Sequence, residues 1–161
     1  MPFVLFHEFF PETAERETRS ITVFPGSPIR LPPAHYGFLD MYCDEPGCDC
    51  RRVFLSVVSS RSKRIEAVVA WGWEDVEFYA KWMRSGGRDM ALMLKGPALN
   101  MGSPETELAP VLLHLFSSVL LKDPSYVARI KRHYALFRDR IDGKRADAAH
   151  SEKVGAATAT Q

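Results

Sequence analysis

Residues 36–71 read YGFLDMYCDEPGCDCRRVFLSVVSSRSKRIEAVVAW, and this stretch decides the fold. It contains three segments whose apolar residues alternate along one face, as in half-buried strands. The three segments are Tyr36–Cys43, Arg51–Ser59 and Arg64–Trp71. The segments between them, Asp44–Gly47 and Ser59–Lys63, are polar and rich in turn residues. Three strands joined by such short turns predict an antiparallel β-meander.

Two further strands are expected on the N-terminal side of the meander. Met1–Phe10 is rich in apolar residues and Thr18–Phe24 is rich in β-branched residues, and the polar segment Pro11–Glu17 is predicted to be a turn between them. The prolines between Pro25 and Pro33 exclude a central strand there, because proline cannot donate to a strand ladder.

After residue 73 the apolar residues recur at helical spacing. Three helices are predicted, over Glu74–Arg84, over Pro110–Leu121 and from Asp123 to Gly143. Met90–Leu94 fits a helix and a strand equally well, and the segment after it is expected to be a loop to residue 104. The chain is therefore predicted to have an α+β fold: an antiparallel meander of four to five strands packed by about three C-terminal α-helices.

The last predicted helix has an apolar stripe and a basic surface. The stripe has a strict 3-4-3-4 spacing over Val127, Ile130, Tyr134, Phe137 and Ile141. So narrow a stripe is typical of a seam between two helices, formed with the preceding helix or with a second copy in a homodimer. Residues 122–145 also hold eight Lys or Arg against three Asp, a local charge of +5.

Length and composition indicate one soluble domain. The chain has 161 residues, of which 46% are hydrophobic, as in ordinary globular proteins. We expect the domain to span residues 1–142 and residues 143–161 to form a disordered tail, because the tail has almost no large apolar side chains. The longest apolar run, Val111–Leu121, is far shorter than the roughly 20 residues of a membrane span. With no basic secretory n-region either, we expect a cytoplasmic protein without a membrane partner.

Three cysteines within eight residues form the chain's most specific chemical feature. Cys43, Cys48 and Cys50 follow the spacing C-x4-C-x-C, and the turn between two strands should bring their sulfurs together. In a reducing compartment such a cluster favours a metal over a disulfide. Thiolates select Zn²⁺ over Mg²⁺ or Ca²⁺, and zinc takes four ligands in a tetrahedron. The sequence therefore predicts a zinc site with three cysteine ligands.

The fourth zinc ligand has several candidates. Among the histidines, His35 is nearest in sequence, but an extended strand from Tyr36 to Cys43 spans roughly 23 Å and would put His35 at the wrong end of the hairpin. The other histidine candidates are His7, His114 and His133, which would have to approach through tertiary packing. The adjacent carboxylates of Asp44 and Asp49, a water or a substrate are further alternatives.

Three classes of function follow from these features. The first is a structural zinc module with a protein partner, acting in interaction or regulation. The second is a small metal-dependent enzyme with an open zinc position, although the zinc-hydrolase, zinc-deaminase and nucleophile-elbow motifs are absent from the sequence. The third is a nucleic-acid-associated protein that uses the basic last helix. Its candidate phosphate contacts are Arg51, Arg52, Lys131 and Arg132. The overall net charge of only +1 gives that class no support.

Overall fold

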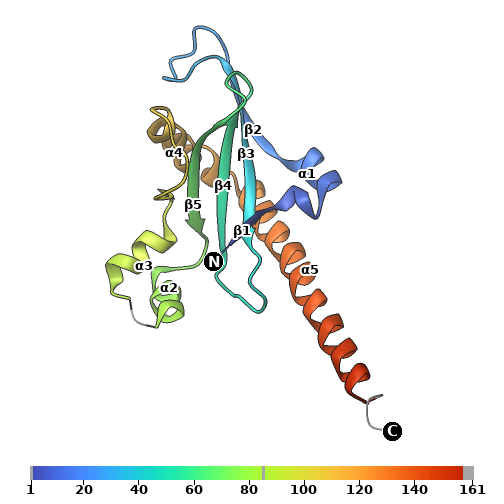
Figure 1. The fold of residues 1–161 in the computed structure, drawn as a ribbon. Coiled ribbons are helices and arrows are strands. Elements are labelled where there is room, and N and C mark those ends of the chain that lie inside the picture. Colours follow the sequence, from blue (N-terminus) through green and yellow to red (C-terminus); the bar gives the residue numbers. More distant parts are fainter. Residues whose placement is uncertain (1, 85, 158–161) are drawn as a thin grey trace.

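An antiparallel sheet forms the centre of the molecule (Figure 1). The computed structural model describes residues 2–84 and 86–157, with side chains described no further than residue 143. Within these ranges the sheet has six strands in the order β1-β3-β4-β5-β6, and β2 also pairs with β3. The strands are β1 (Phe3–Leu5), β2 (Arg19–Val23), β3 (Ala34–Cys43), β4 (Arg52–Ser59), β5 (Ile65–Gly72) and β6 (Ala98–Leu99). The predicted α+β class with an antiparallel meander is confirmed.

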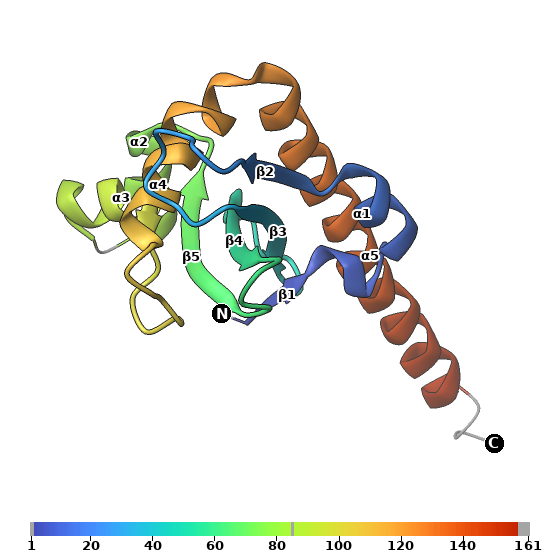
Figure 2. The same ribbon diagram turned by 90° about the horizontal axis from the view of Figure 1, so that it is seen from above.

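The helices outnumber the three that the sequence predicts. The described part of the chain has five α-helices and two short 3-10 helices. These are η1 (Phe6–Glu8), α1 (Pro11–Glu17), α2 (Val76–Met83), α3 (Arg88–Lys95), α4 (Ala109–Ser118), η2 (Leu120–Lys122) and α5 (Pro124–Ala157). Figure 2 shows that α4 and α5 lie on the same side of the sheet, with α4 beside β5 and α5 beside β3.

The core lies between the meander and these two helices. Alternate residues of β3, β4 and β5 point into it, and Leu55 and Val69, which face each other across the β4–β5 pair, are fully buried. Phe116 of α4 packs against β3 through Phe38 and against β5 through Trp71, at centroid distances of 6.4 and 6.2 Å. The alternation that predicts the strands is thus also what fills one face of the sheet with apolar side chains.

The N-terminal segment differs from its prediction. The predicted strand Met1–Phe10 is a strand only at Phe3–Leu5, and the predicted turn Pro11–Glu17 is the helix α1. Proline suits the first position of a helix, because its missing N–H would have no partner there and its φ angle is already helical. Pro11 takes that position in α1, and good helix formers such as Ala14 and Glu15 follow it.

The segment before α4 contains a strand that the sequence does not reveal. Met90–Leu94 belongs to α3, and the predicted loop that follows contains β6, whose Ala98 and Leu99 pair with Ala70 and Val69 of β5. The close approach requires a glycine at residue 96. Gly96 has φ +63°, and a Cβ atom there would lie 2.5 Å from the carbonyl oxygen of Ala70.

The apolar stripe of the last helix packs within its own chain. Ile130, Phe137 and Ile141 are buried in the core, and Phe137 lies 5.6 Å from the ring of Tyr42 on β3. The stripe therefore packs chiefly against the sheet. A homodimer formed through this helix would have to use another face of the helix.

The last helix is longer than predicted: α5 does not end at Gly143 but continues to Ala157. A single glycine costs a helix only about 1 kcal/mol, and the residues around it are mostly good helix formers. The side chains beyond residue 143 and residues 158–161 lie outside the described part, so the disordered tail stays a prediction.

We predict that Gly96→Ala lowers the free energy of unfolding by about 1–3 kcal/mol, because the new Cβ would clash with Ala70 in a left-handed backbone conformation. Urea unfolding measures the change. Gly37→Ala is the matched control, since a Cβ at residue 37 meets its nearest neighbour at an ordinary 3.7 Å. Equal losses in the two variants would contradict this role of Gly96.

Candidate metal centre

A tight turn brings the three cysteines to one end of the β3–β4 pair. Cys43 is the last residue of β3, and Arg52 begins β4. Between them the N–H of Cys48 donates to the carbonyl oxygen of Glu45 at 3.2 Å, with Pro46 and Gly47 in the central positions. Gly47 has φ +73°, which together with the proline matches a type II turn. The residue types in this turn therefore determine where the chain reverses direction.

The three sulfur atoms lie within 4.8 Å of one another. Cys43 and Cys50 are fully buried, and Cys48 is partly exposed. Three sulfurs bound to one tetrahedral zinc would lie about 3.8 Å apart, given a Zn–S distance near 2.3 Å. Shifts of about an ångström would thus bring all three sulfurs onto one ion. Within the described residues, this is the group of side chains that has the spacing for a metal.

Backbone amides stabilise negative charge on the sulfurs. Each cysteine sulfur accepts a hydrogen bond from the backbone two residues further on, at Glu45 for Cys43, at Cys50 for Cys48 and at Arg52 for Cys50. The Cys50 thiol also donates to Cys43, which lowers the pKa of Cys43 to about 6 and raises the pKa of Cys50. Burial raises the pKa of Cys48. A bound cation would be needed to hold all three groups as thiolates at neutral pH.

The loop is fastened to α5 by a buried arginine. Arg138 is only 9% exposed, and its guanidinium group donates to the carbonyl oxygens of Cys43, Glu45 and Cys48 at 2.6, 2.9 and 3.0 Å. No described carboxylate forms an ion pair with it. Its positive charge therefore faces the thiolate cluster and lowers the pKa of Cys43 further.

Two more residues of the same helix face contact the loop. Asp142 accepts from the N–H of Gly47 at 2.8 Å, and the hydroxyl of Tyr134 accepts from the N–H of Arg51 at 3.3 Å. Tyr134, Arg138 and Asp142 are spaced four residues apart, which places them on one face of the helix. Sequence reasoning missed this role, since Tyr134 also belongs to the apolar stripe and the other two residues resemble an ordinary charged surface. Their regular spacing was the available signal.

The candidate phosphate contacts are mostly engaged within the chain. Arg51, at φ +48°, forms ion pairs with Asp49 and Glu74 at 2.9 and 3.2 Å, and Arg52 is buried with its Nε donating to the carbonyl of Leu94. On α5, Arg132 forms an ion pair with Glu17, whereas Lys131 is exposed. These contacts leave little free charge for a nucleic acid at these four positions.

The four candidate histidines do not join the sulfur group. His7 and His114 are exposed, on η1 and α4 respectively. His35 lies at the other end of β3 and shares a hydrogen bond with the hydroxyl of Thr22. His133 is buried and lies between two carboxylates, with Nδ1 2.7 Å from Asp40 and Nε2 2.6 Å from Glu17.

The buried histidine ties α5 to two other elements. Phe6 of η1 stacks on the ring of His133 at 4.1 Å, and the hydroxyl of Tyr42 donates to Asp40, the histidine's partner on β3. Glu17, at the end of α1, accepts from both His133 and Arg132, and these hydrogen bonds lower its pKa. This network positions the helix that carries Arg138, and the structure indicates a structural role for it.

Comparison with known proteins gives no relative: no family model, no curated protein and no solved structure matches this chain. None of the described helices is both long enough and apolar enough to cross a lipid bilayer.

We predict that Arg138→Met lowers the free energy of unfolding by about 2–4 kcal/mol, because it leaves buried carbonyl groups without donors. Urea unfolding measures the loss, and amide hydrogen exchange should quicken in residues 44–50. Lys131→Met is the control, an exposed position on the same helix where a change within about 0.5 kcal/mol is expected. Unchanged exchange in the loop would show that Arg138 does not hold it.

We predict that Glu17 contributes to stability in a pH-dependent way. Its folded-state pKa lies below the ordinary value of 4.5, so its contribution is present above that pH and is lost as the pH falls through the folded-state pKa. Glu17→Gln should therefore cost about 1–2 kcal/mol at pH 6 and progressively less as the pH falls through the folded-state pKa. Urea unfolding across this range measures the difference, with Glu12→Gln on the same helix as control. Parallel pH curves for wild type and Glu17→Gln would contradict the prediction.

Proposed function

We propose that this chain binds one Zn²⁺ through Cys43, Cys48 and Cys50, and that the ion holds the β3–β4 loop in the shape that α5 contacts. The observation that carries the proposal is the convergence of three sulfur atoms within 4.8 Å in a loop whose amides and arginine favour thiolates. Three soft thiolate ligands suit zinc better than magnesium or calcium.

The charge around the cluster supports a zinc–thiolate centre. Three thiolates and one Zn²⁺ carry a net charge of −1, and Arg138 contributes a compensating positive charge from a buried position. A buried guanidinium group that binds only carbonyl groups is costly unless a negative charge lies near it. The zinc–thiolate centre would provide that charge, which is a reason for an arginine at this position.

The fourth ligand in this proposal comes from outside the described group. A ligand from His133 would require the loss of both its carboxylate contacts, and Asp49 is held by Arg51 at 2.9 and 3.0 Å. A water molecule or a donor from a partner protein therefore fits better. If a partner protein supplies the donor, metal binding and partner binding become coupled, in line with the interaction or regulatory role that we propose for the module. The exposed tip Glu45–Gly47 would then be the surface that the partner contacts.

A second candidate function has one observation in its favour. The described residues bring three ligands to the cluster, and a catalytic zinc also has three protein ligands with an open position for water. A small metal-dependent enzyme would further need a base beside that water. Asp44 is half-buried next to Cys43, whereas Asp49 already pairs with Arg51, so Asp44 is the residue to test for that role.

Zinc content of purified variants tests the proposal. We expect one zinc per chain in the wild type and a marked loss of zinc in Cys48→Ala, together with a lower melting temperature, because metal binding contributes to folding free energy. Asp49→Asn is the matched control in the same loop and should retain its zinc. Stoichiometric zinc in Cys48→Ala, or none in the wild type, would overturn the assignment.

A further inference from the structure

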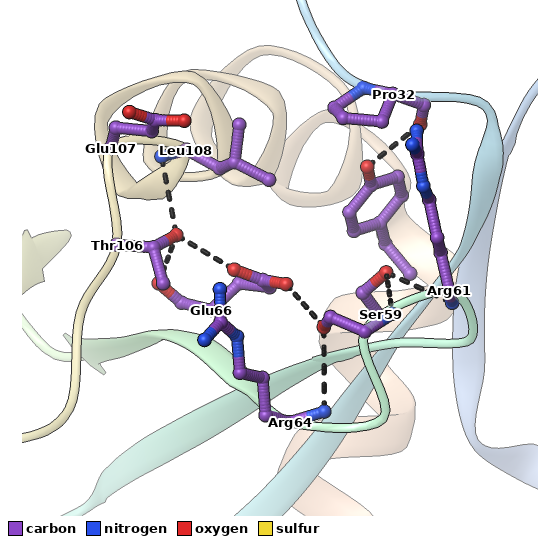
Figure 3. Close-up of a pocket in the computed structure, with 10 residues that line it drawn as sticks. Pro32, Ser59, Arg61, Arg64, Glu66, Thr106, Glu107 and Leu108 are labelled. Carbon is purple, nitrogen blue, oxygen red and sulfur yellow. Dashed lines mark hydrogen bonds between the residues drawn. The ribbon is translucent and has the colours of Figure 1, made fainter.

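A second site lies at the opposite end of the sheet from the cysteines. A pocket of about 530 Å³ opens there between the β4–β5 turn, the segment that precedes α4 and the loop that holds Pro32 (Figure 3). Its volume is in the range of small-molecule sites, which run from roughly 300 to 1,000 Å³. None of the metal-cluster residues lines it.

A buried carboxylate forms part of the pocket wall. Glu66 of β5 is only 3% exposed, yet it lines the pocket. Ser62 donates to its Oε1 at 2.5 Å and Thr106 donates to its Oε2 at 2.7 Å. Burial raises the pKa of Glu66, but the two hydrogen bonds and the positive charge of Arg64 together keep the pKa below its usual range. The group is therefore ionised at neutral pH.

The charge of Glu66 has no direct partner within the described residues. No described Lys, Arg or His approaches it within ion-pair distance, and its two hydrogen-bond donors are neutral hydroxyl groups. Each carboxylate oxygen can accept a further hydrogen bond. The nearest positive charge, on the exposed Arg64, acts on Glu66 from beyond ion-pair distance. A cationic group in direct contact with this buried carboxylate would therefore be favoured.

Two arginines add positive charge to the same pocket. Arg64 lies on the side of Glu66 and Arg61 follows the opposite wall toward Pro32 (Figure 3). Both side chains are exposed, and in the described part of the chain neither guanidinium group forms an ion pair or hydrogen bond. With Glu107 at the rim, the lining holds two negative and two positive side chains. The pocket is thus dipolar and not of one charge.

We propose that this pocket binds a small organic zwitterion, whose ammonium group contacts Glu66 and whose carboxylate contacts Arg61 on the opposite wall. A free amino acid is the simplest molecule of this class. An inorganic anion fits less well, because Glu66 would repel it, and a simple amine would leave Arg61 without a partner. Tyr36 and Leu108 line the pocket beside the charged groups and offer apolar contact for the rest of the ligand.

The same groups also form hydrogen bonds that stabilise the fold. A test of ligand binding therefore has to distinguish it from this structural role. Thr106 donates its N–H and its hydroxyl to Glu66, which joins the segment before α4 to β5. A connection of this kind needs hydrogen bonds but not a negative charge. Glu66→Gln keeps the shape and removes the charge, and it therefore tests for a ligand.

The experiment is amide NMR titration of the isotope-labelled full chain with the standard free amino acids, one at a time. Probes matched to the best binder are its N-acetylated form and the amine that lacks its carboxylate. We expect shifts confined to Tyr36 and to residues 59–66 and 106–108, no binding of the N-acetylated form and weaker binding of the amine. Glu66→Gln should weaken binding by at least about tenfold. Glu105→Gln, an exposed glutamate outside the lining, should leave binding unchanged.

The probes keep the proposal open to contradiction even if Glu66→Gln fails to fold, since the N-acetylated form tests the same contact in the wild type. Equal binding of the N-acetylated form would overturn the proposal. So would an absence of shifts in this region with every amino acid at millimolar concentration, or unchanged affinity in a folded Glu66→Gln.

Discussion

The hydrogen bonds from Arg138 to the carbonyl groups of the β3–β4 loop are the contacts on which the arrangement of this molecule depends. They join the longest helix to the turn that carries the cysteines, across 90 to 95 residues of sequence. This one side chain therefore affects three features: the shape of the loop, the approach of the sulfurs and the position of α5 on the sheet. Because its charge is buried and pairs with no carboxylate among the described side chains, the negatively charged metal centre that we propose is a physical reason for its presence.

Two sites of different character lie at opposite ends of the sheet. Figure 1 shows the β3–β4 loop at one end of the strands and the β4–β5 turn at the other. β3 runs from Tyr36, which lines the dipolar pocket, to Cys43 in the sulfur cluster, an interval of roughly 23 Å for an extended strand. The rigid meander fixes the distance between the two ends. One end is closed by turn geometry and by α5, and the other end is open and surrounded by charged and hydroxyl groups. If both proposals hold, the end of the sheet with the cysteines would serve stability or assembly, and the end with the pocket would serve recognition.

The sequence was most informative where a single local rule governs the chain. Alternation predicted the meander, and Pro46 with Gly47 predicted the turn that gathers the cysteines, because both features depend on near neighbours. The strand β6 could not be found in this way, since two residues carry no detectable period and Gly96 is explained only by the carbonyl of Ala70 beside it. The helix α1 does not stand out in the sequence, because its polar residues Pro11–Glu17 resemble a turn, although Pro11 also suits a first helical position.

The site residues follow the same division. The three cysteines are recognisable from spacing alone, whereas Arg138 and the buried Glu66 acquire their roles from partners that lie far away in sequence. His133 shows the converse: a cysteine cluster makes any histidine a ligand candidate by sequence, whereas in the structure Asp40 and Glu17 contact both of its nitrogens. Long-range pairing of this kind depends on how helices dock on the sheet, which local patterns do not encode.

X-ray absorption at the zinc edge of the protein purified without chelator reports directly on the proposed metal centre. We expect three sulfur neighbours near 2.3 Å and one lighter nitrogen or oxygen neighbour around a single zinc. A zinc shell of nitrogen and oxygen atoms without sulfur, or a protein without zinc, would contradict the proposal.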